Sequence, residues 1–267
     1  MRRFLLIPFG EALLIPHVIA PFSIGGLSNV RRKAQAFGWA ISCSFASGIF
    51  VTAFALWKWG AVEVRGHLGP VLFLTFVAAA WLLLTALLFP WLGLAISDDV
   101  IERRNPGALV ALCGALLGVA LIYAGGNLGE GPSNWENIFS AGLGTVGFFG
   151  SWFLLEWTGH FSRAIAEERD LASGVRICGF FLALGLILGR SVAGDWHSTS
   201  ATFRDFVTDG WPAGAIVVLA AIIESLLRPS RGRRSSSFWP HGVAPAVVYV
   251  ALAMAWFLYL GWWEGKP

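Results

Sequence analysis

The chain has 267 residues, of which 56% are hydrophobic and only 13% are charged. Soluble domains carry about 25% charged residues, so this chain has too few polar side chains to cover a soluble globule of its size. The composition therefore excludes a soluble enzyme, a disordered chain and a disulfide scaffold, and it predicts a polytopic membrane protein.

Seven apolar runs are each long enough to cross a bilayer as a helix, which takes about 20 residues. None of them alternates polar and apolar residues with the period of two that a membrane barrel requires. Helices satisfy every backbone group internally, so the sequence predicts an all-α fold with about seven transmembrane helices. The runs are 36–59, 70–92, 107–125, 137–158, 173–190, 211–227 and 243–263.

The segment before the first run, Phe4 to Gly26, is apolar but interrupted by prolines and polar residues. We expect a re-entrant or interfacial segment, and an eighth full crossing is the alternative. Prolines free backbone carbonyls that can line a polar cavity, so Glu11 and His17 are candidate ion-handling residues. Plain interfacial anchoring explains them equally well. The interruptions are Pro8, Glu11, Pro16, His17 and Pro21.

Lysine and arginine residues are concentrated in alternate connections between the runs, a pattern that sets orientation during insertion. The rich side should face the cytoplasm, which leaves the C-terminus outside. Contact with anionic lipid head groups accounts for the net charge of +3, and no nucleic acid partner is expected. The rich side carries Arg31, Arg32, Lys33, Arg103, Arg104, Arg163, Arg169, Arg176, Arg228, Arg231, Arg233 and Arg234, and the other side carries Lys58, Arg65, Arg190, Arg204 and Lys266.

One stretch of the chain matches another stretch 65 residues further on. The repeated unit is a helix, a short charged loop and a second helix. Because each unit has two crossings, the two copies should be related by a pseudo-twofold axis along the membrane normal. Identical pairs are Glu102/Glu167, Arg104/Arg169, Val110/Val175, Cys113/Cys178 and Gly114/Gly179.

The residues that open the second helix of each copy have a structural explanation. The asparagine or aspartate is a good N-cap, because the first N–H groups of a helix need an acceptor. The glutamate suits the positive end of the helix, and the arginine suits an anionic lipid surface. We favour these roles over a direct functional one. The residues are Glu102, Arg104 and Asn105 in the first copy and Glu167, Arg169 and Asp170 in the second.

This doubled unit resembles the YjfL-like family of small bacterial inner-membrane proteins, a domain family of unknown function. The likeness lies in a charged Glu-x-x-Asn/Asp turn that leads into a helix rich in Ala, Gly and Leu, twice within about residues 70–195. The family has glycine before the Asn, whereas this chain has arginine in both copies. The resemblance implies a four-helix core of two tandem copies and a location in the bacterial inner membrane. It implies no activity.

Charged groups inside or beside the runs are candidates for function, because they are costly in lipid. Glu156 and His160 are spaced to share a helical face near Arg163. They could form a proton or cation relay, or an interfacial pair beside a snorkelling arginine, which we favour. Glu224 precedes Arg228 by four residues, which favours an intrahelical ion pair over a functional role.

The connection between the third and fourth runs is rich in glycine and carries Asn127, Glu130 and Asn134. A turn is the simpler interpretation, and a small outward-facing polar site is the alternative. In the last outer connection, apolar residues within 203–207 have helical spacing. They predict a short helix that lies on the membrane surface.

No cofactor or metal site is predicted. The five histidines are scattered without His-x-x-His spacing, and Cys43, Cys113 and Cys178 lie inside the runs without Cys-x-x-Cys spacing. A haem or metal site would need ligands from distant helices.

The first functional hypothesis is a non-enzymatic structural or accessory subunit that packs with copies of itself or with other membrane subunits. It follows from the small-residue helix faces and the lack of a convergent catalytic set. The alternative is a small ion or solute channel or transporter with a path between the two repeats, and a cofactor-binding redox subunit is third. We divide the chain into an N-terminal part (1–69), a core of two tandem repeats (about 70–130 and 136–195) and a C-terminal part (196–267).

Overall fold

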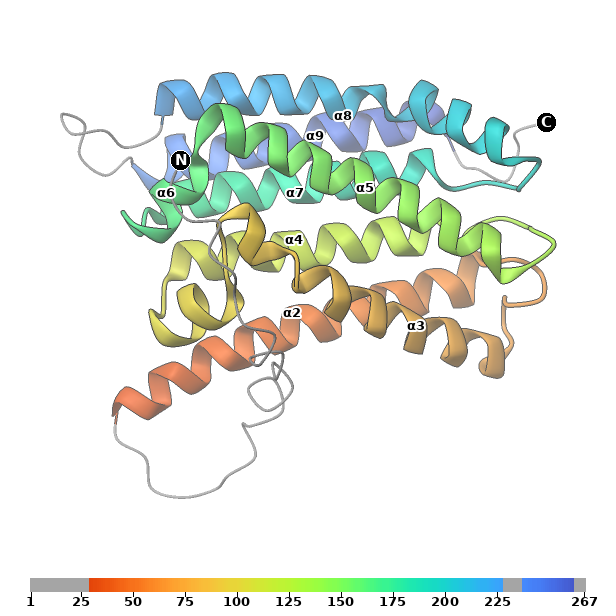
Figure 1. Ribbon diagram of the computed structural model, residues 1–267, viewed down its shortest axis with the longest axis horizontal. Helices are drawn as coiled ribbons and strands as arrows, with labels where there is room; N and C mark the ends of the chain where they lie inside the picture. The colour runs from red at the N-terminus through yellow and green to blue at the C-terminus, as the bar shows by residue number, and fades with distance from the viewer. Residues whose placement is uncertain (1–28, 228–236, 262–267) are drawn as a thin grey trace.

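The computed structural model describes residues 29–227 and 237–261, with the backbone alone for 29–34. The predicted re-entrant segment, with Glu11 and His17, lies outside the described residues. Within the described ranges the chain forms helices and no strand (Figure 1). The long helices are α2 (Asn29–Trp59), α3 (Leu68–Ala86), α4 (Pro106–Gly125), α5 (Asn134–Gly159), α7 (Leu171–Ser191), α8 (Thr199–Leu227) and α9 (Ala244–Leu260), and the short ones are η2 (Phe89–Leu92), η3 (Ile96–Glu102), α6 (Phe161–Ala166) and η4 (Trp239–Val243).

Seven of the helices are long and apolar enough to cross a membrane, and each corresponds to one predicted run. The predicted run 70–92 ends earlier than expected, at Ala86. Pro90 has no N–H with which to continue an α-helix. The chain therefore turns through η2 and leaves it at Gly93, whose φ of 91° suits glycine.

The helix of the predicted run 211–227 begins earlier than expected, at Thr199. The prediction of a separate surface helix over 203–207 is wrong, because these residues are early turns of α8. Asp209 and Gly210 are buried, and a Cβ atom on Gly210 would lie 3.2 Å from the hydroxyl of Ser191. Packing against the end of α7 thus holds this segment in line with the rest of α8.

Helices α4 and α7 form the centre of the bundle, and 72% of the most apolar stretch of each is buried. They run parallel, because Gly107 packs against Gly174 near their starts and Gly125 packs against Gly189 near their ends. A Cβ atom on Gly114 would lie 2.7 Å from the Cα of Cys178, too close for any residue but glycine. Small residues allow such close backbone approach between helices in lipid.

The other helices surround this central pair (Figure 1). Helix α2 packs on α4, where the hydroxyl of Thr52 donates to the carbonyl of Ala120 at 3.4 Å. Helices α8 and α9 pack on α7. Helix α5 crosses obliquely over the central pair and contributes the fully buried Trp152, whose ring centroid lies 4.4 Å from that of Phe181. The aromatic core therefore lies between α5 and α7.

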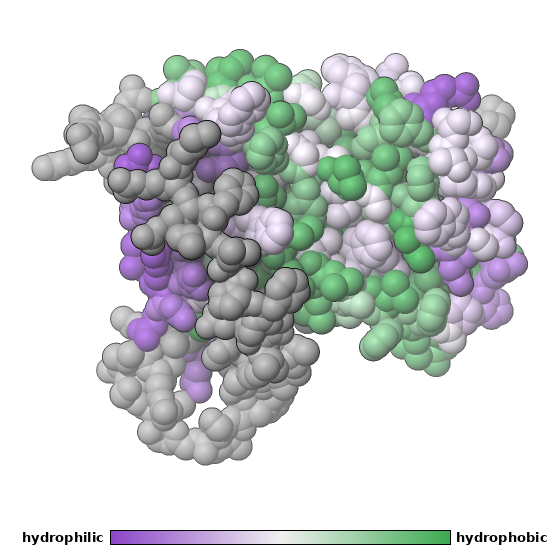
Figure 2. Space-filling model, viewed as in Figure 1, coloured by the Kyte–Doolittle hydropathy of each residue, from purple (hydrophilic) through white to green (hydrophobic). Residues whose placement is uncertain are grey.

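The surface is apolar in a broad band across the helices and hydrophilic at both ends (Figure 2). Trp91 in η2 and Trp135 and Trp157 near the two ends of α5 are 80%, 62% and 69% exposed, as is typical of residues at a membrane interface. The chain is therefore an all-α polytopic membrane protein. We name its two ends by their contents: the η3/α6 end holds the starts of α4 and α7, and the glycine-loop end holds the connections 60–67, 126–133 and 192–198.

Candidate functional site

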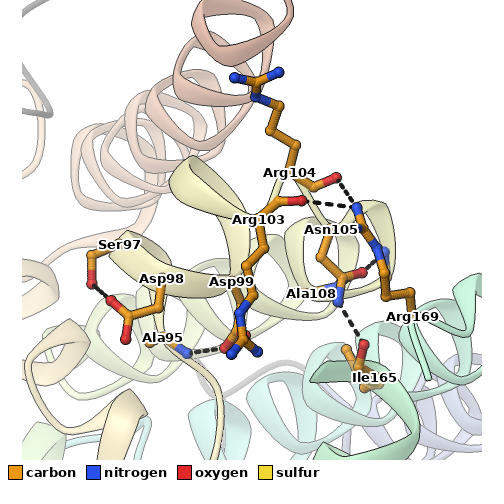
Figure 3. Close-up of polar contacts among 11 residues, drawn as sticks. Ala95, Ser97, Asp98, Asp99, Arg103, Arg104, Asn105, Ala108, Ile165 and Arg169 are labelled. Atoms are coloured by element: carbon orange, nitrogen blue, oxygen red, sulfur yellow. Dashed lines mark hydrogen bonds and ion pairs between the residues drawn. The ribbon is translucent and has the colours of Figure 1, made fainter. Parts of the chain in front are cut away.

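The starts of α4 and α7 are held by side-chain caps at the η3/α6 end. Asn105 Oδ1 accepts hydrogen bonds from the N–H groups of Gly107 and Ala108 at 3.0 and 3.3 Å (Figure 3). Asp170 Oδ2 accepts one from the N–H of Ser173 at 2.8 Å. Both predicted N-caps therefore form, and they satisfy backbone groups that a helix start leaves unpaired.

The loops before the two caps also bind each other. Arg104 and Arg169 have left-handed backbones, with φ of 51° and 57°. Nη2 of Arg169 donates to the carbonyls of Arg103 and Arg104 at 2.8 and 2.9 Å (Figure 3). Nδ2 of Asn105 donates to the carbonyl of Ile165 at 2.6 Å. These polar residues thus connect one helix start to the other.

The two glutamates of the predicted repeat lie on the surface. Glu102 is exposed. Glu167 forms an ion pair with Arg163 at 3.0 Å, and the side chains of Arg163 and Glu167 are 70% and 66% exposed. Exposed ion pairs contribute little to stability, about 0–1 kcal/mol. Together with the caps, these contacts hold the starts of α4 and α7 in place.

Glu156 holds the start of α6. Its carboxylate accepts from the N–H and the hydroxyl of Ser162 at 3.0 and 2.6 Å. The expectation that Glu156 and His160 share a helical face is wrong, because α5 ends at Gly159 and His160 turns the chain with a φ of 46°. The glutamate acts as an acceptor for the turn that follows its own helix.

Glu224 forms an ion pair with Arg176 of α7 that is completely buried, with both side chains 0% exposed. Nε and Nη2 of the arginine donate to the two carboxylate oxygens at 2.7 and 2.9 Å. Arg228, the partner expected from spacing, lies outside the described residues. The carboxylate thus joins α8 to α7, which the intrahelical prediction did not anticipate.

The other donors of Arg176 extend this ion pair into a network. Nη1 donates to the carbonyl of His241 at 2.5 Å, and Nη2 donates to the hydroxyl of Ser173 at 3.0 Å. That hydroxyl in turn donates to the carboxylate of Asp170 at 2.6 Å. A buried ion pair is tolerated when hydrogen bonds satisfy its remaining groups. The network therefore fixes α7, α8 and η4 relative to one another.

Sequence reasoning assigned Arg176 to a basic connection and missed its pairing. A signal was present, because Arg176 is the fourth residue of the predicted run 173–190 and Glu224 is the fourth from the end of 211–227. The two runs cross the membrane in opposite directions. The start of one run and the end of the other therefore lie at the same membrane face, and Arg176 and Glu224 are expected at the same depth in the membrane.

A cavity of about 470 Å³ lies at the glycine-loop end, between the connection after α2 and the connection after α4. Asn127 and Asn134 of the predicted polar loop line it, together with Glu63. Glu130 has another role, since its carboxylate accepts from the N–H of Val62 at 3.2 Å and ties the two connections together. The structure thus brings two of the three predicted loop residues to one cavity.

Asn127 is 3% exposed and forms part of the cavity wall. Its Nδ2 donates to the carbonyl of Tyr123 at 2.7 Å. Its Oδ1 is buried and accepts no hydrogen bond from the described part of the chain. An unsatisfied buried acceptor costs about 1–3 kcal/mol, so this oxygen is a source of local instability in the cavity wall.

The fold defines an integral membrane protein, with seven candidate membrane-crossing helices in the part of the chain that the structure describes. Across residues 29–227 and 237–261, no group of three or more His, Cys, Asp or Glu side chains could hold a metal ion. Comparisons with protein families, with characterised proteins and with solved structures find no match.

Proposed function

We propose that the protein is a non-enzymatic structural or accessory subunit of a complex in a bacterial inner membrane. The observation that carries the proposal is the construction of the bundle centre. Helices α4 and α7 touch backbone to backbone, and the buried ion pair joins α7 to α8. Close-packed interiors yield little to deformation. Such a bundle offers a constant surface to a partner subunit or to a second copy.

A channel or transporter path between the two repeats has less support. The glycine contacts between α4 and α7 extend from the starts of both helices to their ends, so a path there would require the two helices to separate. Two of the candidate ion-handling residues, Glu156 and Glu224, are held by different partners, Ser162 and Arg176. Separate structural contacts of this kind favour the subunit hypothesis.

The internal repeat and its resemblance to the YjfL-like family are part of the same proposal. The N–H of Asn105 donates to the carbonyl of Asp99, and 65 residues later the N–H of Asp170 donates to the carbonyl of Ala164. The arginine before each cap has a positive φ, a conformation that glycine adopts most easily. The family's glycine at this position fits that backbone.

The orientation follows from the predicted distribution of lysine and arginine. We place the η3/α6 end in the cytoplasm and the C-terminus outside, since α9 runs toward the glycine-loop end. Accessibility of single engineered cysteines to a membrane-impermeant maleimide tests this assignment. Labelling of the 126–133 connection only after the membrane is opened would overturn it.

Crosslinking within the membrane tests the subunit proposal. The full-length chain with Cys43→Ala provides the background. One variant adds Phe76→Cys on α3 and the other adds Val218→Cys on α8, at positions where the native side chains are 74% and 60% exposed. Helices α3 and α8 lie on opposite sides of the bundle (Figure 1). We expect a discrete crosslinked species from one of these faces. A monomer in nanodiscs with no adduct from either face would overturn the proposal.

Liposome flux separates the two hypotheses. We expect the purified protein to conduct no more than empty liposomes in gradients of pH, sodium or potassium. Flux that is reduced by Glu156→Gln would favour the channel or transporter hypothesis instead. The exposed-pair variant Arg163→Gln, which alters a charge at the same end, is the matched control.

A further inference from the structure

A groove of about 480 Å³ runs between α8 and α9, with a residue of α7 in its lining. Its floor includes Ile187 of α7 and Ile216 of α8, which are 1% and 4% exposed. Each of its two walls carries an alanine, Ala215 on α8 and Ala255 on α9. These small side chains leave open a space that larger residues would fill.

The two ends of the groove differ in polarity. The hydrogen-bonding side chains of its lining, Trp211, Trp256 and Tyr259, lie toward the glycine-loop end, where α8 begins and α9 ends. The deeper end is lined by Leu219 and Leu252, which have no polar side-chain group. Tryptophan and tyrosine are enriched where a membrane protein meets the head groups of the lipids. An occupant that matches this lining is apolar along most of its length and polar at the glycine-loop end.

The length of the groove matches one leaflet of a bilayer. Along α8 its lining extends from Trp211 to Leu219, which is about 12 Å at 1.5 Å per residue. The hydrocarbon core of a bilayer is about 30 Å thick, so one leaflet contributes about 15 Å. The predicted membrane run of α8 begins at Trp211, so the groove starts at the interface and reaches toward the middle of the membrane.

The volume of the groove decides between a helix and a hydrocarbon chain. A helix about 10 Å wide would occupy about 900 Å³ over the same length, roughly twice the volume of the groove. A single acyl chain is much thinner than a helix. Both α8 and α9 are long and apolar enough to cross a membrane, so the groove between them opens to lipid. We propose that it binds one acyl chain of a phospholipid whose head group lies at the glycine-loop end, a role beyond that of a structural subunit.

A lipid in this groove should exchange more slowly than the other lipids around the bundle. Transfer from the bilayer gains no hydrophobic free energy, because lipid tails are as apolar as the lining. The gain comes from van der Waals contacts with side chains of α7, α8 and α9, which an unfilled space would forfeit.

Native mass spectrometry of the full-length protein tests the proposal. The protein is extracted from nanodiscs of palmitoyl-oleoyl phosphatidylethanolamine, and bound lipid is counted while the detergent concentration is raised. We expect one lipid per chain to remain after the others have been lost. A gradual loss of all lipids, with no such step, would overturn the proposal.

A pair of matched variants connects the retained lipid to the groove. Ala255→Phe places a ring in the groove and should lower the occupancy of the retained lipid about tenfold or more, because the ring takes the place of the chain. Ala251→Phe makes the same change at an exposed position one turn away on α9, outside the lining, and should leave the occupancy unchanged. Equal retention by the two variants would place the lipid elsewhere and overturn the proposal.

A second variant keeps the test independent of any one folding defect. Ala215→Phe fills the groove from α8 and should have the same effect as Ala255→Phe, and thermal unfolding shows whether each variant folds. The same variants separate a lipid from a protein partner. Val218, the crosslinking position on α8, lies outside the groove lining. If Ala255→Phe keeps the retained lipid but abolishes the crosslink from Val218→Cys, a partner subunit occupies the groove and the proposal is overturned.

Discussion

Helix α7 buries one arginine near each end, and the two have different partners. Arg176 is 0% exposed and binds the carboxylate of Glu224. Arg190 is 2% exposed and binds main-chain carbonyls, with Nε 3.1 Å from the oxygen of Gly261 and Nη2 3.5 Å from that of Leu260. Nη1 of Arg190 has no hydrogen-bond partner among the described residues.

The comparison shows two ways of burying a positive charge in one membrane-crossing helix. The η3/α6 end uses a bidentate ion pair with an opposite charge. The glycine-loop end uses the carbonyl groups at the end of α9, where the helix dipole is negative, together with the electrostatic attraction of the buried Asp209 of α8. Both arginines reach α9, because His241 lies just before it and Gly261 just after it. The two ends of α9 should therefore differ in their sensitivity to mutation.

The largest effect is expected at the charged pair. Glu224→Leu leaves Arg176 buried without its counter-ion, which should lower the free energy of unfolding by about 3–5 kcal/mol. Thermal unfolding in nanodiscs measures the loss. The double variant Arg176→Met/Glu224→Leu should recover much of it, because two apolar side chains of similar volume replace the pair. A double variant as unstable as the single one would show that the pair is not the cause.

A smaller effect is expected at the other end of α7. Arg190→Met removes two hydrogen bonds to carbonyls and the electrostatic interaction with the buried Asp209 of α8, but it breaks no bidentate ion pair, so we expect a loss of about 1–3 kcal/mol. The same unfolding assay applies, with the full-length chain. A loss equal to that of Glu224→Leu would remove the distinction between the two ends.

Alanine variants of the two N-caps should show whether the network around Arg176 and Glu224 extends to Asp170. Replacement of an N-cap by alanine costs about 1 kcal/mol, and Asn105→Ala also removes the buried hydrogen bond to the carbonyl of Ile165, so we expect a loss of about 1–3 kcal/mol. Asp170→Ala should cost more, because Asp170 also accepts from the hydroxyl of Ser173, a partner of Arg176. Equal losses in equilibrium unfolding would show that the cap and the ion pair are independent.

The smallest effect is expected at the exposed pair of the η3/α6 end. Arg163 and Glu167 meet at 3.0 Å but remain open to solvent, so Arg163→Gln should change the unfolding free energy by about 0–1 kcal/mol. A side-by-side melt with Glu224→Leu provides the comparison. A loss above that range would mean that Arg163 has a further structural partner.

The fold was largely predictable from the sequence, because lipid demands long apolar helices and the caps are local. Asn105 and Asp170 each accept a hydrogen bond from the N–H of a residue three positions further along the chain. The errors come from packing. The first turns of α8 look amphipathic in sequence, but packing of the buried Gly210 against the end of α7 keeps them in line with the rest of α8.

The candidate site was predictable only in part. The chemistry of Asn127 and Asn134 is visible in the sequence, but their meeting with Glu63 in one cavity depends on how two connections pack. The pair of Arg176 and Glu224 lies 48 residues apart and requires a comparison of depth between two runs. Spacing within one helix could not reveal it.

The two arginines of α7 also impose an order on biosynthesis. Every partner described above for their side chains beyond α7 itself, in α8, η4 and at the end of α9, is translated later than α7. A nascent chain that has completed only α7 therefore holds two uncompensated charges, which lipid disfavours. We therefore expect the last two helices to stabilise α7 in the bilayer once they have been translated.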